Sequence, residues 1–174
     1  KSGNGWMVHA TATADLPHKW YNISYGMQLS ENKIEISGRP QATVAANEAL
    51  EYKLFTAQVA LLMHIKPFQE HFTIDIGPML QYNGKLELED DEQEAYFINN
   101  YDALLAEDIS DISQFNINGA IGATLGFGHF KLRAQYIYGF TNILDKLNDQ
   151  DFANGLEKFK GNQSMLAFTA LITF

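Results

Sequence analysis

The residues with the clearest chemical potential are carboxylates gathered in one stretch of the chain. Between Glu87 and Asp111 there are ten Asp and Glu residues and no Lys or Arg. Carboxylate oxygens are hard ligands that suit Ca²⁺, and the densest candidate group is Glu89, Asp90, Asp91 and Glu92. The spacing of an EF-hand loop is absent, and an acidic run is more often a solvated loop. We therefore expect no metal ion, with a divalent-cation site and a protein-binding surface as the alternatives.

The histidines and cysteines give no pattern of a catalytic centre. No two of the five histidines stand at metal-ligand spacing on one predicted strand, and none has a serine beside it as in a nucleophile elbow. The chain has no cysteine, which excludes disulfides, thiolate catalysis and zinc–cysteine sites. The expectation is a protein without catalytic residues or cofactor, with a lipid-modifying hydrolase as the alternative.

The elements that must position these residues alternate apolar and polar side chains. An alternation of period two indicates a β-strand with two unlike faces; a helix would scatter Lys131, Arg133 and Gln135 around its circumference. The chain length suits a single domain, 1–174. Seven segments show the alternation: 6–14, 21–29, 55–65, 72–82, 114–127, 130–141 and 165–174.

Bulk properties exclude several classes of function. A net charge of −9 makes nucleic acid an unsuitable partner. No stretch approaches the roughly 18 consecutive apolar residues of a membrane helix, whereas the strands of a membrane barrel average to the near-neutral mean hydropathy of −0.20. Residues 1–6 lack the apolar core and cleavage site of a signal peptide, so an exported protein would be represented here by its processed form or a fragment.

The connections between the predicted strands alternate in length. Segments 15–19, 66–70 and 128–129 are short, whereas 38–50, 88–112 and 143–161 are long and polar. Short turns at one end and long loops at the other are typical of an outer-membrane barrel, with turns periplasmic and loops extracellular. The sequence therefore predicts an all-β, antiparallel, up-and-down transmembrane β-barrel of about eight strands, with the C-terminus periplasmic.

The two faces of the strands differ in residue size. Most polar-face residues are small, as a narrow lumen requires, among them Gly77, Ala120, Gly122, Ser24 and Thr124. The charged residues within the strands are mainly Asp75, Lys131 and Arg133. One carboxylate and two cations in a narrow lumen can neutralise one another. We predict that they form a structural network and do not line a pore.

Aromatic residues occur at both ends of the apolar face. Phe72 and Tyr82 lie ten residues apart, which for a tilted strand spans roughly 25 Å, the height of the apolar band between aromatic girdles. The predicted girdle residues are Tyr21, Phe72, Phe127, Phe130 and Phe174 at the short-turn end, and Tyr82, Phe115, Tyr138 and Phe140 at the long-loop end.

Seven readable strands are an odd number, and single-chain bacterial barrels have an even one. An open strand edge is not viable in lipid. We expect an eighth strand upstream, running outward before the first visible strand; the alternative is irregular pairing hidden in residues 38–50.

Three stretches together resemble a known family: 72–80, 119–143 and the last strand, which ends on Phe174. They are similar to the outer-membrane β-barrel family of Bacteroidota, related in form to the small OmpA- and OmpX-type barrels, over roughly residues 52–174. The resemblance implies a barrel of about eight strands inserted by the outer-membrane assembly machinery. One branch of that family includes a component of type IX secretion and gliding.

From these observations we expect an integral outer-membrane protein that is not an enzyme. Its role would be that of a membrane scaffold or a subunit of a larger envelope complex of the secretion or assembly type. The expected partners are outer-membrane lipid or lipopolysaccharide and other envelope proteins. A lipid-modifying enzyme, a small pore and a divalent-cation-binding surface protein are the alternatives.

Overall fold

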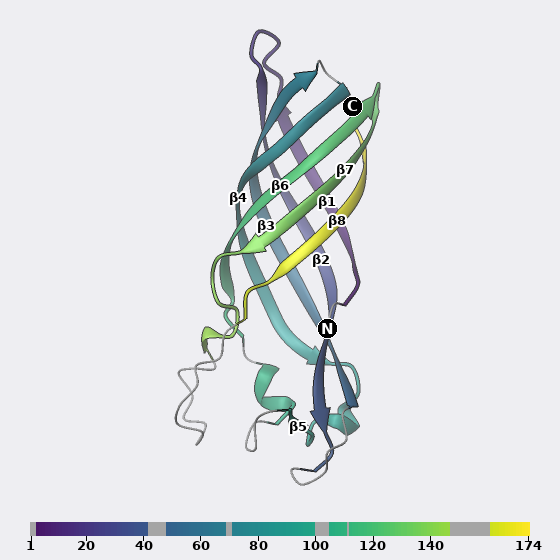
Figure 1. The fold of residues 1–174 in the computed structure, drawn as a ribbon, viewed down its shortest axis with the longest axis vertical. Helices are drawn as coiled ribbons and strands as arrows, with labels where there is room; N and C mark the ends of the chain where they lie inside the picture. The colour runs from purple at the N-terminus through teal and green to yellow at the C-terminus, as the bar shows by residue number, and fades with distance from the viewer. Residues whose placement is uncertain (1–2, 42–47, 69–70, 100–104, 111, 147–160) are drawn as a thin grey trace.

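The computed structural model describes residues 3–41, 48–68, 71–99, 105–110, 112–146 and 161–174. These residues form one antiparallel sheet in the order β1-β2-β3-β4-β6-β7-β8, with the short β5 paired to β2. The sheet curls about the long axis of the molecule, and its strands are inclined to that axis (Figure 1). The bounds are β1 Gly5–Ala14, β2 Tyr21–Arg39, β3 Glu48–Phe68, β4 Phe72–Leu88, β5 Phe97–Ile98, β6 Phe115–Phe127, β7 Phe130–Gly139 and β8 Ser164–Ile172.

The seven long strands are those that the alternation predicts, and consecutive long strands are neighbours in the sheet. The prediction of an all-β, antiparallel, up-and-down architecture is confirmed. Tight turns make this order possible; between β6 and β7, Gly128 adopts a φ of 59°, which glycine reaches without strain.

Three strands extend well beyond their predicted ends toward the long loops. β2, β3 and β4 have 19, 21 and 17 residues, whereas β1, β7 and β8 have 10, 10 and 9. The predicted loops 38–50 and 88–112 are therefore partly structured, because β2 ends at Arg39, β3 starts at Glu48, and 88–112 contains η2 (Asp91–Gln93), β5 and η3 (Glu107–Ser110).

A hydrophobic cluster explains these longer strands. Side chains of β3, β4, β5 and η3 form a buried core at the long-loop end, and Tyr52 donates a hydrogen bond of 2.9 Å to the carbonyl of Ala106. Burial of apolar area stabilises the strand extensions and the loop against each other. The cluster consists of Leu50, Tyr52, Leu54, Leu86, Ile98, Ala106, Ile109 and Ile112.

The edges of the sheet are β1 and β8, and no pairing joins them within the described residues. Each step from β1 to β8 along the sheet is antiparallel. Six reversals leave β1 and β8 running in the same direction, from the long-loop end to the short-turn end.

Candidate functional site

The distribution of polarity over the sheet is inverted relative to that of a water-soluble protein. Along β2, for example, Ser24, Gln28 and Ser30 are buried, whereas Tyr25 and Met27 are 67% and 61% exposed. The same holds for β6, where Asn116 and Asn118 are buried and Phe115 and Ile121 are exposed. The polar side chains therefore lie on the inner face of the curled sheet, and the large apolar side chains lie on its outer face.

Asp75 of β4 is the centre of a buried polar network on the inner face. Asp75 is completely buried, with 0% of its surface exposed. One carboxylate oxygen, Oδ1, lies 2.6 Å from Nδ1 of His64 and accepts a hydrogen bond of 2.7 Å from Thr73. The other, Oδ2, accepts a hydrogen bond from Thr124 and lies 3.1 Å from Nε of Arg133. These partners provide the compensation that a buried carboxylate requires.

The strand register explains why these side chains meet. His64 of β3 pairs directly with Asp75, and Thr73 pairs with Thr124, which in turn pairs with Arg133. The direct β6 neighbour of Asp75 is Gly122, at which a Cβ atom would come within 2.5 Å of the Ala134 carbonyl oxygen. The absence of a side chain at this position leaves the inner face open between Asp75 and β7.

The three residues of the predicted charge network are not all in contact. Asp75 and Arg133 form an ion pair, but Lys131 takes part in no ion pair among the described residues. Lys131 lies two positions closer to the short turn, in register with Gly126 and Leu171. The sequence does not predict the other members of this network, which are His64, Thr73, Thr124 and Ser24. The one signal that the sequence gives for them is their position on the polar face of the strands.

Ser24, His64 and Asp75 have the connectivity of a hydrolase triad. Ser24 Oγ lies 2.7 Å from His64 Nε2, and His64 Nδ1 lies 2.6 Å from Asp75 Oδ1. Ser24 is only 2% exposed, however, and β2 is paired with β1 on one side and β3 on the other around this residue. The strand ladders thus take up the backbone N–H groups that an oxyanion hole would need. The arrangement suits a structural network better than a nucleophile.

A second polar network lies on the inner face closer to the long loops. Gln58 connects Gln28 to Gln81, and Gln81 continues to Asn118. Between this network and the Asp75 network the inner face also holds a small apolar cluster, so the interior is not polar throughout. The apolar cluster consists of Ala60, Leu62, Met79, Ala120 and Ile137.

Apart from Phe174, which lies beyond the end of β8 and lines a cavity there, the predicted girdle residues lie at the ends of the outer face. At the long-loop end, Tyr82 packs edge-on against Phe115, and Tyr138 packs edge-on against Phe140, with ring centroids 5.3 and 5.7 Å apart. At the short-turn end Phe127, Phe130 and Phe174 are exposed, and Tyr21 and Phe72 are half-buried. This placement gives two aromatic zones separated by aliphatic side chains.

The described part of the acidic segment contains two short helices, and Glu89 and Asp90 have separate partners. Glu89 bridges Lys33 and Lys53, with shortest contacts of 2.8 and 3.3 Å. The hydrogen bonds from Lys33 and then from Lys53 lower the pKa of Glu89 to about 2. Asp90 caps η2 by accepting from the Glu92 amide, and Asp91 and Glu92 lie in its first turn. In the described part of the chain, no three His, Cys, Asp or Glu side chains come together as a metal site.

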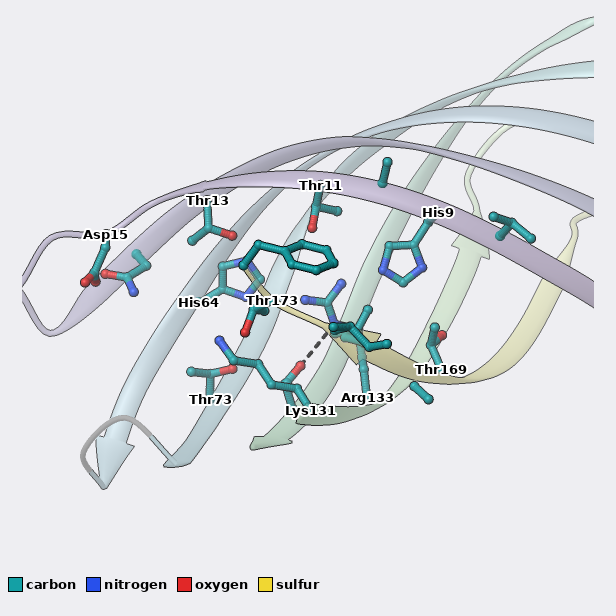
Figure 2. Close-up of a pocket in the computed structure, with 18 of the residues that line it drawn as sticks. His9, Thr11, Thr13, Asp15, His64, Thr73, Lys131, Arg133, Thr169 and Thr173 are labelled. Carbon is teal, nitrogen blue, oxygen red and sulfur yellow. Dashed lines mark hydrogen bonds between the residues drawn. The ribbon is translucent and has the colours of Figure 1, made fainter. Parts of the chain in front are cut away.

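A cavity of about 860 Å³ opens at the short-turn end, between the sheet edges β1 and β8. Figure 2 shows His9 of β1 and Lys131 and Arg133 of β7 pointing into it. Its polar lining includes His9, Thr11, Thr13, Asp15, His64, Lys66, Thr73, Lys131, Arg133, Thr169 and Thr173.

Comparison with known proteins gave no match to a family model, to a curated protein or to a solved structure. No helix within the described ranges is long and apolar enough to cross a membrane.

Proposed function

We propose that this chain is an integral β-barrel protein of a bacterial outer membrane, with its apolar outer face toward lipid. The inverted polarity of the sheet is the observation that carries the proposal. In water, a surface of exposed apolar residues such as Val59, Leu80, Ile117 and Leu132 would be costly, whereas hydrocarbon provides the environment that these side chains favour. The two aromatic zones lie where the girdles of such a barrel are expected.

The proposal includes closure of the barrel by one further strand between β1 and β8. Both edge strands run toward the short-turn end, so an antiparallel neighbour of both must run toward the long loops. A second copy of this chain in the same membrane orientation also has two edge strands that run toward the short-turn end. Neither of them could pair antiparallel with β1 or β8, so a second copy cannot provide the missing strand. With the added strand the number of barrel strands is even and no edge is open to lipid.

The resemblance to the outer-membrane barrels of Bacteroidota supports the same location, with the long loops extracellular and Phe174 periplasmic. The proposed role is non-enzymatic, as a membrane scaffold or a subunit of an envelope complex of the secretion or assembly type. The packed cluster around Tyr52 supports this role, because it stabilises the long-loop end as a folded platform on which a partner can dock.

Two experiments test this proposal. The folded protein extracted in mild detergent should migrate on unheated gels differently from the boiled protein and give a β-type circular dichroism spectrum. Migration that does not change with heating, together with a soluble protein in detergent-free buffer, would contradict the membrane location. Affinity purification from native membranes should recover envelope proteins in stoichiometric amounts, and a detergent-solubilised monomer with no partner would contradict the subunit role.

The connectivity Ser24–His64–Asp75 is the specific observation that favours a second candidate, a lipid-modifying hydrolase. A fluorophosphonate probe separates the two candidates because it labels activated serines. We expect no labelling above that of Ser24→Ala, since Ser24 is buried. Labelling lost in Ser24→Ala and retained in the neighbouring Ser30→Ala variant would favour the hydrolase.

A further inference from the structure

The cavity at the short-turn end is cationic, although the chain as a whole is strongly acidic. Lys66 of β3 and Lys131 and Arg133 of β7 line it, whereas Asp15 is the only acidic side chain among its described lining residues. Asp75, which forms an ion pair with Arg133, provides the second acidic side chain of the region. Three cationic side chains thus accompany two acidic side chains, in a protein with a net charge of −9.

Among the described residues, neither lysine has an acidic partner. Lys66 donates to two neutral oxygens, the Leu16 carbonyl at 3.2 Å and Asn22 Oδ1 at 3.1 Å. Lys131 forms no ion pair within the described ranges, and Figure 2 shows its side chain extending into the cavity toward Thr73. Ammonium groups without carboxylate partners at the wall of a cavity attract an anion.

Neutral hydrogen-bond donors surround these charges. Thr11, Thr13 and Thr169 line the cavity from β1 and β8. In addition, Nε2 of His9 is shielded from solvent and has no hydrogen-bond partner in the described structure. Because a buried polar atom without a partner is costly, this nitrogen marks a place where a ligand oxygen or a water molecule would be stabilised.

We propose that this cavity binds a phosphate group. Lysine is a common phosphate-binding residue and acts as a point charge, and hydroxyl groups satisfy the remaining phosphate oxygens. The two lysines belong to β3 and β7, so a further strand between β1 and β8 would leave them in place. The site does not depend on the membrane location. A free phosphate and a phospholipid headgroup present the same chemistry.

The test compares phosphate binding in three proteins purified in a phosphate-free maltoside detergent. The proteins are the unmodified chain, the double variant Lys66→Gln/Lys131→Gln, and the control Lys85→Gln, whose lysine is exposed and lies outside the cavity lining. Sodium phosphate is titrated at constant ionic strength and binding is measured by calorimetry. Heat-modifiable gel migration checks that each variant is folded.

We expect saturable binding by the unmodified chain and the control, and binding weaker by about tenfold or more in the double variant. Absence of saturable binding, or equal binding by the double variant, would overturn the proposal. Mixed micelles containing phosphatidylglycerol show whether the bound phosphate group is that of a lipid headgroup or of free phosphate. Competition with phosphate that depends on the two lysines assigns the site to a lipid headgroup, and lack of competition assigns it to free phosphate.

Discussion

Asp75 is the residue on which the inner polar network depends, because four side chains contact its two carboxylate oxygens. The network combines a charged pair with hydrogen bonds around a fully buried carboxylate. Replacing one member leaves the opposite charge buried and unpaired, which is the most costly way to disrupt such a pair.

Asp75→Asn should therefore destabilise the folded chain by about 3–5 kcal/mol, since Arg133 loses its counter-ion. Unfolding by urea in lipid vesicles, followed by the fluorescence of the two tryptophans, measures this cost. The double variant Asp75→Asn/Arg133→Gln is the control and should lose less than the sum of the two single variants. A cost below about 1 kcal/mol for Asp75→Asn would contradict a central role for this carboxylate.

Glu89 provides a prediction on pH dependence at the other end of the molecule. Its pKa is about 2, below the ordinary 4.5, because Lys33 and Lys53 donate to its carboxylate. A lowered pKa means that the stabilisation is fully present above pH 4.5 and is lost as the pH falls toward 2. Lys33→Met should raise the Glu89 pKa toward its ordinary value, as measured by carboxyl carbon NMR. An unchanged pKa in this variant would show that Lys33 is not the main cause.

At this scale the sequence predicts which residues are polar and inward, but not which of them touch. Asp75 and Arg133 were grouped because charges are rare within the alternating segments. Lys131 was grouped by the same reasoning, yet the structure directs it into the cavity. The contacts of Ser24 and His64 depend on strand register, which alternation alone does not determine.

The alternation of apolar and polar residues predicts that each long strand exists, but it does not predict the length of the strand. Periodicity identifies the part of each strand that has unlike faces. It underestimates β2, β3 and β4 toward the long loops, where the apolar residues Leu50, Tyr52 and Leu54 face inward. Ile98 and Ile109 of the acidic segment pack in one cluster with these residues, and charge composition alone does not predict this contact.

A substitution on the outer face distinguishes a strand in lipid from a strand in water. Ile76 of β4 is 43% exposed and lies near the middle of the predicted apolar band. Ile76→Arg should cost about 2–4 kcal/mol if this position faces the bilayer centre, as measured by unfolding in vesicles. The matched control Phe127→Arg, at the short-turn end, should cost about 0–1 kcal/mol, because the penalty falls toward the interface. Equal and small effects at both positions would contradict a lipid-facing strand.

At the scale of the whole molecule, the sheet requires one further strand between β1 and β8 to close into a barrel, and the described residues do not provide it. Seven long strands place two edges of the same direction at the sides of one cavity. The odd number of alternating segments predicts this strand from the sequence. The cationic character of the cavity is not predictable in this way, because it arises from β3 and β7 side chains that line the cavity together.

The central claim is that the outer face contacts lipid. Because the chain has no cysteine, a single nitroxide label can be attached through Ile121→Cys, Asp91→Cys or Lys19→Cys without further changes. Collision rates with oxygen and with a water-soluble nickel complex are then measured by electron paramagnetic resonance in lipid vesicles. If the outer face contacts lipid, the label at position 121 should collide readily with oxygen and be shielded from nickel. The labels at positions 91 and 19 should be accessible to nickel and collide less often with oxygen. Nickel accessibility at position 121 equal to that at position 91 would contradict this claim.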